Sequence, residues 1–157
     1  MKITLLLMGK TAFSYLNEGI SLYEKRLSFY VNYTKIEIPE LKGASSLREE
    51  QIKEKEGELI LKNIKPAEEV VLLDSKGEKF TSEAFAAYIE KKIIYGGKDI
   101  VFVVGGAYGF SKEVYGRASG MVSLSEMTFS HQIVRLIFLE QLYRAFTIIK
   151  GEPYHHK

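Results

Sequence analysis

The chain has 157 residues, about the length of one domain, and 46% of them are apolar, which excludes intrinsic disorder. The longest apolar runs fall far short of the roughly 20 residues that a membrane-spanning helix needs, and no basic, cleavable leader pattern opens the chain. The absence of cysteine excludes disulfides and thiolate chemistry, and the net charge of +2 is too balanced to indicate nucleic-acid binding by itself. We therefore expect one soluble, cytoplasmic domain that covers residues 1–157.

The pattern of apolar residues predicts alternating strands and helices. In chain order, the predicted elements are a strand at 2–8, a helix at 13–30, a strand at 31–38, a charged helix at 48–62, a strand at 69–74, a helix at 82–95, a strand at 100–104, a short helix from 111, a strand at 121–124 and a helix at 130–149. Ser46 with Glu49 has the form of a capping box, Ser82 is a predicted helix cap, and residues 75–77 are a predicted turn. Apolar strands that alternate with helices indicate an α/β fold with a parallel sheet covered on both faces.

A glycine-rich segment, residues 105–109 (Gly-Gly-Ala-Tyr-Gly), follows the most apolar predicted strand. Ligands of parallel sheets bind at the carboxyl ends of the strands, where glycine lets the backbone approach them. The spacing differs from the G-x-G-x-x-G dinucleotide fingerprint, so an ordinary tight turn is equally compatible with it. Residues 124–129 follow the last strand, and Leu73 and Asp74 end an earlier one. Together these segments predict one pocket at the sheet edge, but they do not name its ligand.

The three histidines, His131, His155 and His156, all lie near the end of the sequence. They lack further ligands at the spacing of a metal site, so no metal is predicted. His131 stands at the start of the last helix, where a structural polar residue that meets free backbone amides is the favoured interpretation. His155 and His156 lie in a tail that is either frayed or, if docked, able to supply a general base or a phosphate contact.

The last predicted helix combines an ion-pair spacing with a broad apolar surface. Glu140 and Arg144 are four residues apart, which predicts a surface salt bridge, although an Arg144 at the pocket edge would instead contact RNA phosphates. Arg135 does not share a helix face with Arg144. Apolar residues cover a wide arc of the helix, namely Ile133, Leu136, Ile137, Tyr143 and Phe146. An arc of this width suggests a partner subunit.

Four segments, in this order, resemble the RlmH family of ribosomal RNA methyltransferases: residues 102–109, 124–132, 140–146 and 154–155. Shorter matches at 2–5, 23–27 and 55–57 extend the resemblance over the whole chain. The family implies a SPOUT-type α/β knot, in which a parallel sheet is flanked by helices and the C-terminal end forms a trefoil knot. It also implies a homodimer that uses S-adenosyl-L-methionine to methylate N3 of a pseudouridine in 23S ribosomal RNA within the assembled ribosome.

The resemblance also implies site residues. By position, the methyl donor rests against Leu73, Gly105 and a loop formed by Leu124, Ser125, Glu126, Met127, Thr128 and Phe129. The implied catalytic residues are His155, Arg144 and His156, with Arg144 on the RNA side and either histidine open as the base. This chain has Ser130 at the position where the family resemblance leads us to expect a proline. A serine can act there as the N-cap of the last helix.

The mechanistic hypothesis is that a neutral imidazole removes the N3 proton while nucleophile, methyl group and sulfur are held in line. Because the net charge is only +2, we expect little activity on isolated RNA. Two alternatives stay open, namely a SPOUT methyltransferase that acts on transfer RNA and a non-catalytic, ribosome-associated module.

Overall fold

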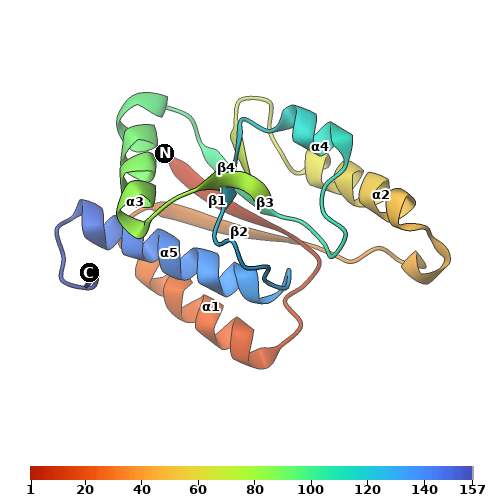
Figure 1. Ribbon diagram of the computed structural model, residues 1–157, viewed down its shortest axis with the longest axis horizontal. Coiled ribbons are helices and arrows are strands. Elements are labelled where there is room, and N and C mark those ends of the chain that lie inside the picture. The colour runs from red at the N-terminus through yellow and green to blue at the C-terminus, as the bar shows by residue number, and fades with distance from the viewer. Residues whose placement is uncertain (157) are drawn as a thin grey trace.

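Five parallel strands form one sheet in residues 1–156, the part of the chain that the computed structural model describes (Figure 1). The strands are β1 (Lys2–Met8), β2 (Asn32–Ile38), β3 (Glu69–Lys79), β4 (Ile100–Val104) and β5 (Gly120–Ser123). Their spatial order is β2-β1-β4-β3-β5, and every residue of the central strand β4 is buried. The predicted parallel α/β sheet is therefore confirmed, and residues 2–8 and 100–104 have the predicted bounds.

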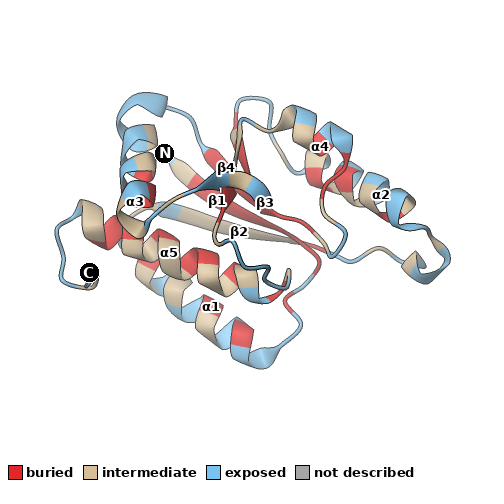
Figure 2. Ribbon diagram, viewed as in Figure 1, coloured by how far each residue is buried: buried red, intermediate tan, exposed pale blue. Residues whose placement is uncertain are grey.

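Helices cover both faces of this sheet. They are α1 (Ser14–Leu27), α2 (Glu49–Lys62), α3 (Ser82–Lys91), α4 (Lys112–Arg117) and α5 (Ile133–Ile149), with shorter turns η1 (Ala44–Ser46) and η2 (Lys92–Gly96). Helices α1, α3 and α5 lie on one face of the sheet, and α2 and α4 lie on the other (Figures 1 and 2). Side chains of β1 alternate between the two faces, so that Leu5 packs with the first group of helices and Leu6 with the second. None of the helices in the described residues is both long and apolar enough to cross a membrane.

The predicted turn at residues 75–77 is wrong. Strand β3 continues to Lys79, and its pairing with β5 shifts register between Leu73 and Glu78. Gly77 permits this close approach, because a Cβ atom at this position would lie only 2.6 Å from the backbone nitrogen of Val122. The glycine that suggested a turn is in fact needed where two backbones pass each other.

The capping box predicted at Ser46 and Glu49 is also wrong. The Ser46 hydroxyl donates to the carbonyl of Gly43 at 2.8 Å, within the short turn η1. Helix α2 begins after Arg48, whose backbone N–H donates to Oε1 of Gln51 at 2.9 Å. The pattern was shifted by two residues, because a hydroxyl can bond its own turn as readily as a helix end.

The predicted helix at 82–95 is capped one residue earlier than expected. Oγ1 of Thr81, and not the Ser82 hydroxyl, accepts the N–H of Ala84 at 3.1 Å. The α-helix ends at Lys91, and the π-helical turn η2 replaces its predicted last turn. Gly97 then closes the segment in the left-handed conformation, with φ of +65°.

Helix α5 uses its wide apolar arc mostly within its own chain. It packs against α1 and against α3 on one face of the sheet, and Leu136 and Tyr143 join the core formed there. At its first turn Ile133 keeps 39% of its surface exposed. Part of the arc is thus covered within the chain, and the partner subunit that the sequence suggests stays a prediction.

Candidate functional site

A pocket of about 350 Å³ opens at the carboxyl ends of β3, β4 and β5. This volume falls within the range of roughly 300–1,000 Å³ that is usual for small-molecule sites. Most of the predicted donor-binding residues line it: Leu73, Gly105, Leu124, Ser125, Met127, Thr128 and Phe129. Three segments far apart in the sequence thus meet at one sheet edge, as their placement after parallel strands predicts.

The glycine turn forms a wall of bare backbone, and each of its glycines is required for a different reason. At Gly105 a Cβ atom would lie 2.9 Å from the ring of Phe110, and at Gly106 it would lie 2.7 Å from both carboxylate oxygens of Glu56. Gly109 has a φ of +85° and donates its N–H to the carbonyl of Gly106 at 3.2 Å, which closes the turn. The segment is a tight turn, as one sequence interpretation predicts, and it also forms a pocket wall, whereas ligand binding there stays a prediction.

The loop at 124–129 is held by its own polar groups. The Ser123 hydroxyl donates to the carbonyl of Ser125 at 3.0 Å, and the Ser125 hydroxyl accepts the N–H of Met127 at 2.9 Å. Glu126 is the one predicted donor-binding residue that does not line the pocket. Its carboxylate pairs instead with Nζ of Lys79 at 2.9 Å and its side chain is 82% exposed. That ion pair ties the loop to the end of β3.

Asp74 lies at the pocket edge with both carboxylate oxygens engaged. Oδ2 accepts the hydroxyl of Tyr115 at 2.5 Å and Oδ1 accepts the N–H of Lys76 at 2.8 Å. Burial and the hydrogen bond to Asp74 raise the pKa of Tyr115 to about 12. The tyrosine therefore stays a neutral donor, and Asp74 acts as a structural acceptor at the end of the strand.

His131 lines the pocket from the segment before α5. Burial lowers the pKa of its imidazole, and the positive charge of Arg135 lowers it further. The Ser130 hydroxyl accepts the N–H of Ile133 at 3.1 Å. Helix α5 begins only at Ile133, however, and Gln132 holds its N-cap position, so the predicted helix start and N-cap at Ser130 are wrong. His131 therefore presents a neutral ring to the pocket at neutral pH.

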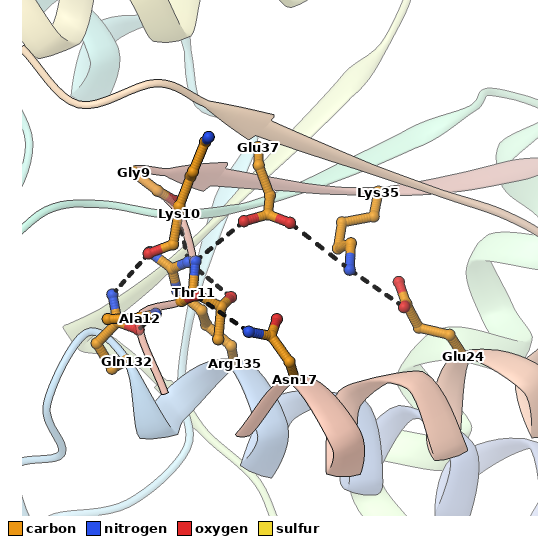
Figure 3. A network of polar contacts seen from close by, with 10 residues as sticks. All are labelled: Gly9, Lys10, Thr11, Ala12, Asn17, Glu24, Lys35, Glu37, Gln132 and Arg135. Carbon is orange, nitrogen blue, oxygen red and sulfur yellow. Dashed lines mark hydrogen bonds and ion pairs between the residues drawn. The ribbon is translucent and has the colours of Figure 1, made fainter. Parts of the chain in front are cut away.

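The fully buried side chain of Arg135 fastens this end of α5 to the end of β1 (Figure 3). Its guanidinium donates to the carbonyls of Met8 and Gly9 at 3.0 and 2.9 Å and to Oγ1 of Thr11 at 3.0 Å. Its Nε atom donates to the carbonyl of His131, also at 3.0 Å. The sequence interpretation did not identify this residue as important, although a lone basic residue among apolar helix neighbours was a usable signal.

A second polar cluster surrounds the C-terminal tail. Arg144 donates twice to Oε1 of Glu140, at 3.0 and 2.6 Å, which confirms the predicted salt bridge. Its Nη1 contacts Nδ1 of His155 at 3.0 Å, and its guanidinium lies 4.9 Å from the centre of the Tyr154 ring. The Nε2 atom of His155 lies 2.8 Å from a carboxylate oxygen of Glu83. The tail is thus docked onto α3 and α5, and the frayed alternative is wrong.

These contacts define the tautomer of His155. A guanidinium can only donate, so Nδ1 of His155 accepts from Arg144, and Nε2 carries the proton that faces Glu83. Both ring nitrogens are therefore occupied. In this arrangement His155 has no free lone pair with which to accept a proton.

The tail cluster and the pocket involve different residues of the chain. Arg144 stands ten residues beyond Val134, the last pocket residue on α5, which is about 15 Å along the helix axis. Neither Arg144 nor His155 lines the pocket, and His156 is exposed. In residues 1–156 there is also no group of three or more His, Asp or Glu side chains able to hold a metal ion. The predicted catalytic residues and the predicted donor site are therefore two separate regions of the chain.

Comparison with known proteins identifies the family. A family described as "Predicted SPOUT methyltransferase" matches residues 1–155. Proteins named ribosomal RNA large subunit methyltransferase H are similar over the full length of both chains, with 54% identity in Parabacteroides distasonis, 53% in Christiangramia forsetii and 52% in Flavobacterium psychrophilum. The pocket that joins the carboxyl ends of β3, β4 and β5 thus occurs in a chain that belongs to the SPOUT methyltransferase family.

Proposed function

We propose that this protein transfers a methyl group from S-adenosylmethionine to N3 of a pseudouridine in 23S ribosomal RNA, on the assembled ribosome in the cytoplasm. The observation that carries the proposal is the pocket at the carboxyl ends of β3, β4 and β5, in a chain whose relatives are named as ribosomal RNA methyltransferases. The single domain over residues 1–157, expected from the length of the chain, and the C-terminal trefoil knot, implied by the resemblance, stay predictions.

The pocket residues fit a methyl donor of this kind. Bare backbone at Gly105 and Gly106 offers amide and carbonyl groups to an adenosine, and Leu124, Met127 and Phe129 offer apolar surface to its base. When bound, the donor supplies an electrophilic methyl group on a sulfonium. The chain's part is to hold that group in a fixed direction and to exclude water from it.

The N3 proton of the pseudouridine must leave before or during methyl transfer, and His155 is the proposed base. Because its Nδ1 accepts from Arg144 in the docked tail, that contact has to break first. An RNA phosphate would compete for the guanidinium of Arg144 through paired, charge-assisted hydrogen bonds. We infer that RNA binding draws Arg144 away and so frees Nδ1 of His155 to accept the proton.

The proposed homodimer follows from the separation between the tail residues and the pocket of the same chain. About 15 Å of α5 separate Arg144 from Val134, the last residue of this helix that lines the pocket, and neither Arg144 nor His155 lines the pocket of its own chain. A second copy that places its tail over the first copy's pocket would complete the site. We propose this arrangement, in which each site is built from two chains.

The test is methylation of ribosomes that lack the modification. Incubation with S-adenosylmethionine carrying a labelled methyl group should label one pseudouridine of 23S RNA in assembled ribosomes and give much less product on protein-free RNA. Labelling of transfer RNA instead would favour the alternative SPOUT activity. Absence of donor binding by calorimetry would favour the non-catalytic module.

A further inference from the structure

The carboxylate of Glu56 lies behind the glycine turn, and one of its oxygens is buried without a hydrogen-bond partner in the described residues. Glu56 is half-buried on α2, and its Oε1 atom is buried without a hydrogen-bond partner among residues 1–156. Both carboxylate oxygens lie so close to Gly106 that a Cβ atom there would be 2.7 Å from each of them. Gly106 itself lines the pocket, so this carboxylate lies directly behind one residue of the pocket wall.

An unpaired buried carboxylate is costly, because it loses hydration without gaining hydrogen bonds or an opposite charge. Burial accordingly raises the pKa of Glu56. The nearest lysine along the same face of the helix does not relieve it, because Lys53 pairs with Glu50 at 3.1 Å. The other carboxylate near the pocket, Asp74, already accepts hydrogen bonds at both oxygens. Glu56 is therefore the carboxylate at this site with unused capacity for a positive charge.

We infer that Glu56 is a specificity-determining residue for the methyl donor: its carboxylate, held behind Gly106, favours a positively charged sulfonium over the neutral thioether that remains after transfer. The inference rests on the proposed donor. Glu56 acts at a distance through its field and does not line the pocket. Because Glu56 is half-buried, its field is screened less than that of a fully exposed charge, so we expect it to change affinity several-fold.

A purely steric role is the competing explanation, in which Glu56 only supports the glycine turn. The two explanations differ in how they treat ligands of the same shape. S-adenosylmethionine carries the sulfonium charge, and S-adenosylhomocysteine, its product, lacks it. A supporting role affects both ligands equally, whereas an electrostatic role affects only the charged one.

The experiment is calorimetric titration of the full-length protein with both ligands. We compare the native chain, Glu56→Gln, and Glu54→Gln as the matched control, since Glu54 is an exposed carboxylate on the same helix. Glu56→Gln should weaken S-adenosylmethionine about five- to tenfold and S-adenosylhomocysteine less than about twofold. Glu54→Gln should change neither. Glu56→Asp, which keeps the charge, should retain most of the preference for the sulfonium.

Equal losses for the two ligands, or no loss for either, would overturn the inference while leaving the proposed function in place. A native chain that binds neither ligand would overturn both. Thermal unfolding without ligand separates these results from a folding defect. Because the substitution removes an unpartnered buried charge, Glu56→Gln should unfold at the same temperature as the native chain or higher.

Discussion

The donor pocket and the tail cluster differ in how they are built, although both depend on α5. The pocket is made of bare backbone, apolar side chains and groups whose hydrogen bonds are satisfied, such as Asp74 and Ser125. The tail cluster is made of charged and aromatic side chains, and in it Arg144 and His155 are hydrogen-bonded to each other. The pocket is thus open in the unliganded chain, whereas the hydrogen-bonding groups of the tail already contact one another. Under the proposed function, the pocket binds a small cofactor as it stands, and the tail exchanges its contacts when it meets RNA.

The largest effect should come from removing the proposed base. His155→Ala should lower single-turnover methylation of ribosomes by about 10²-fold or more, because it removes the group that accepts the N3 proton. Donor affinity should stay unchanged, since His155 does not line the pocket. The measurements are methyl incorporation under single-turnover conditions and calorimetry.

His156→Ala is the matched control for this experiment. Its side chain is exposed, so methylation should stay within about twofold of the native rate. The reverse result, a large loss for His156→Ala and none for His155→Ala, would assign the base to the other histidine. It would also show that the docked tail differs from the active one.

Substitution of the two arginines of α5 should separate stability from activity. Arg135→Met removes a buried cation that serves four acceptors, and we expect a loss of about 3 kcal/mol, or about 6–12 °C in Tm. Arg144→Met removes a partly exposed salt bridge and should cost less than about 1 kcal/mol in stability, yet it should slow methylation strongly. Thermal unfolding and methylation of both variants measure the contrast. Equal destabilisation by the two substitutions would contradict the distinction between anchor and tail.

A substitution in the wall of the pocket should have a smaller effect, which is measured as a change in ligand affinity. Gly106→Ala brings a methyl group against the carboxylate of Glu56, so the turn must shift, and S-adenosylhomocysteine should bind about tenfold more weakly. Adding Glu56→Ala should restore most of that affinity, because the clash is gone. Gly116→Ala is the control, since a Cβ atom there meets nothing within 4 Å. Failure of the double variant to recover would mean that backbone freedom, and not the packing against Glu56, requires glycine at this position.

Sequence reasoning located the pocket well, because the carboxyl ends of parallel strands meet at one edge whatever the details of packing. Leu73, Gly105 and most of the 124–129 loop could be placed on that ground alone. It could not place Glu126, because this exposed carboxylate forms an ion pair with Lys79. The two residues are distant in the sequence, and only the fold brings them together. The C-terminal trefoil knot, by contrast, was predicted only from the resemblance to the RlmH family.

The contacts of Arg135, Glu56 and His155 were also beyond sequence reasoning. Each depends on a partner more than 45 residues away: Met8 for Arg135, Gly106 for Glu56 and Glu83 for His155. No spacing rule relates such pairs, because they are set by how helices seat on the sheet. Local caps failed for a different reason, since neighbouring hydroxyls such as Thr81 and Ser82 are nearly equivalent in propensity.

The smallest predicted effect is a pH dependence that belongs to the pocket end of α5. Burial lowers the pKa of His131 in the folded state, so below the ordinary value of about 6.5 the unfolded chain binds this proton first. The contribution of His131 to stability is therefore complete above that pH and declines as the pH falls toward the folded pKa. Because the ring is only partly buried, the loss should be well under about 1 kcal/mol. Thermal unfolding between pH 7 and pH 5 should show a shallower decline for His131→Gln than for the native chain. His156→Gln, whose side chain is exposed, should follow the native curve. A native slope in His131→Gln would place the titrating group elsewhere.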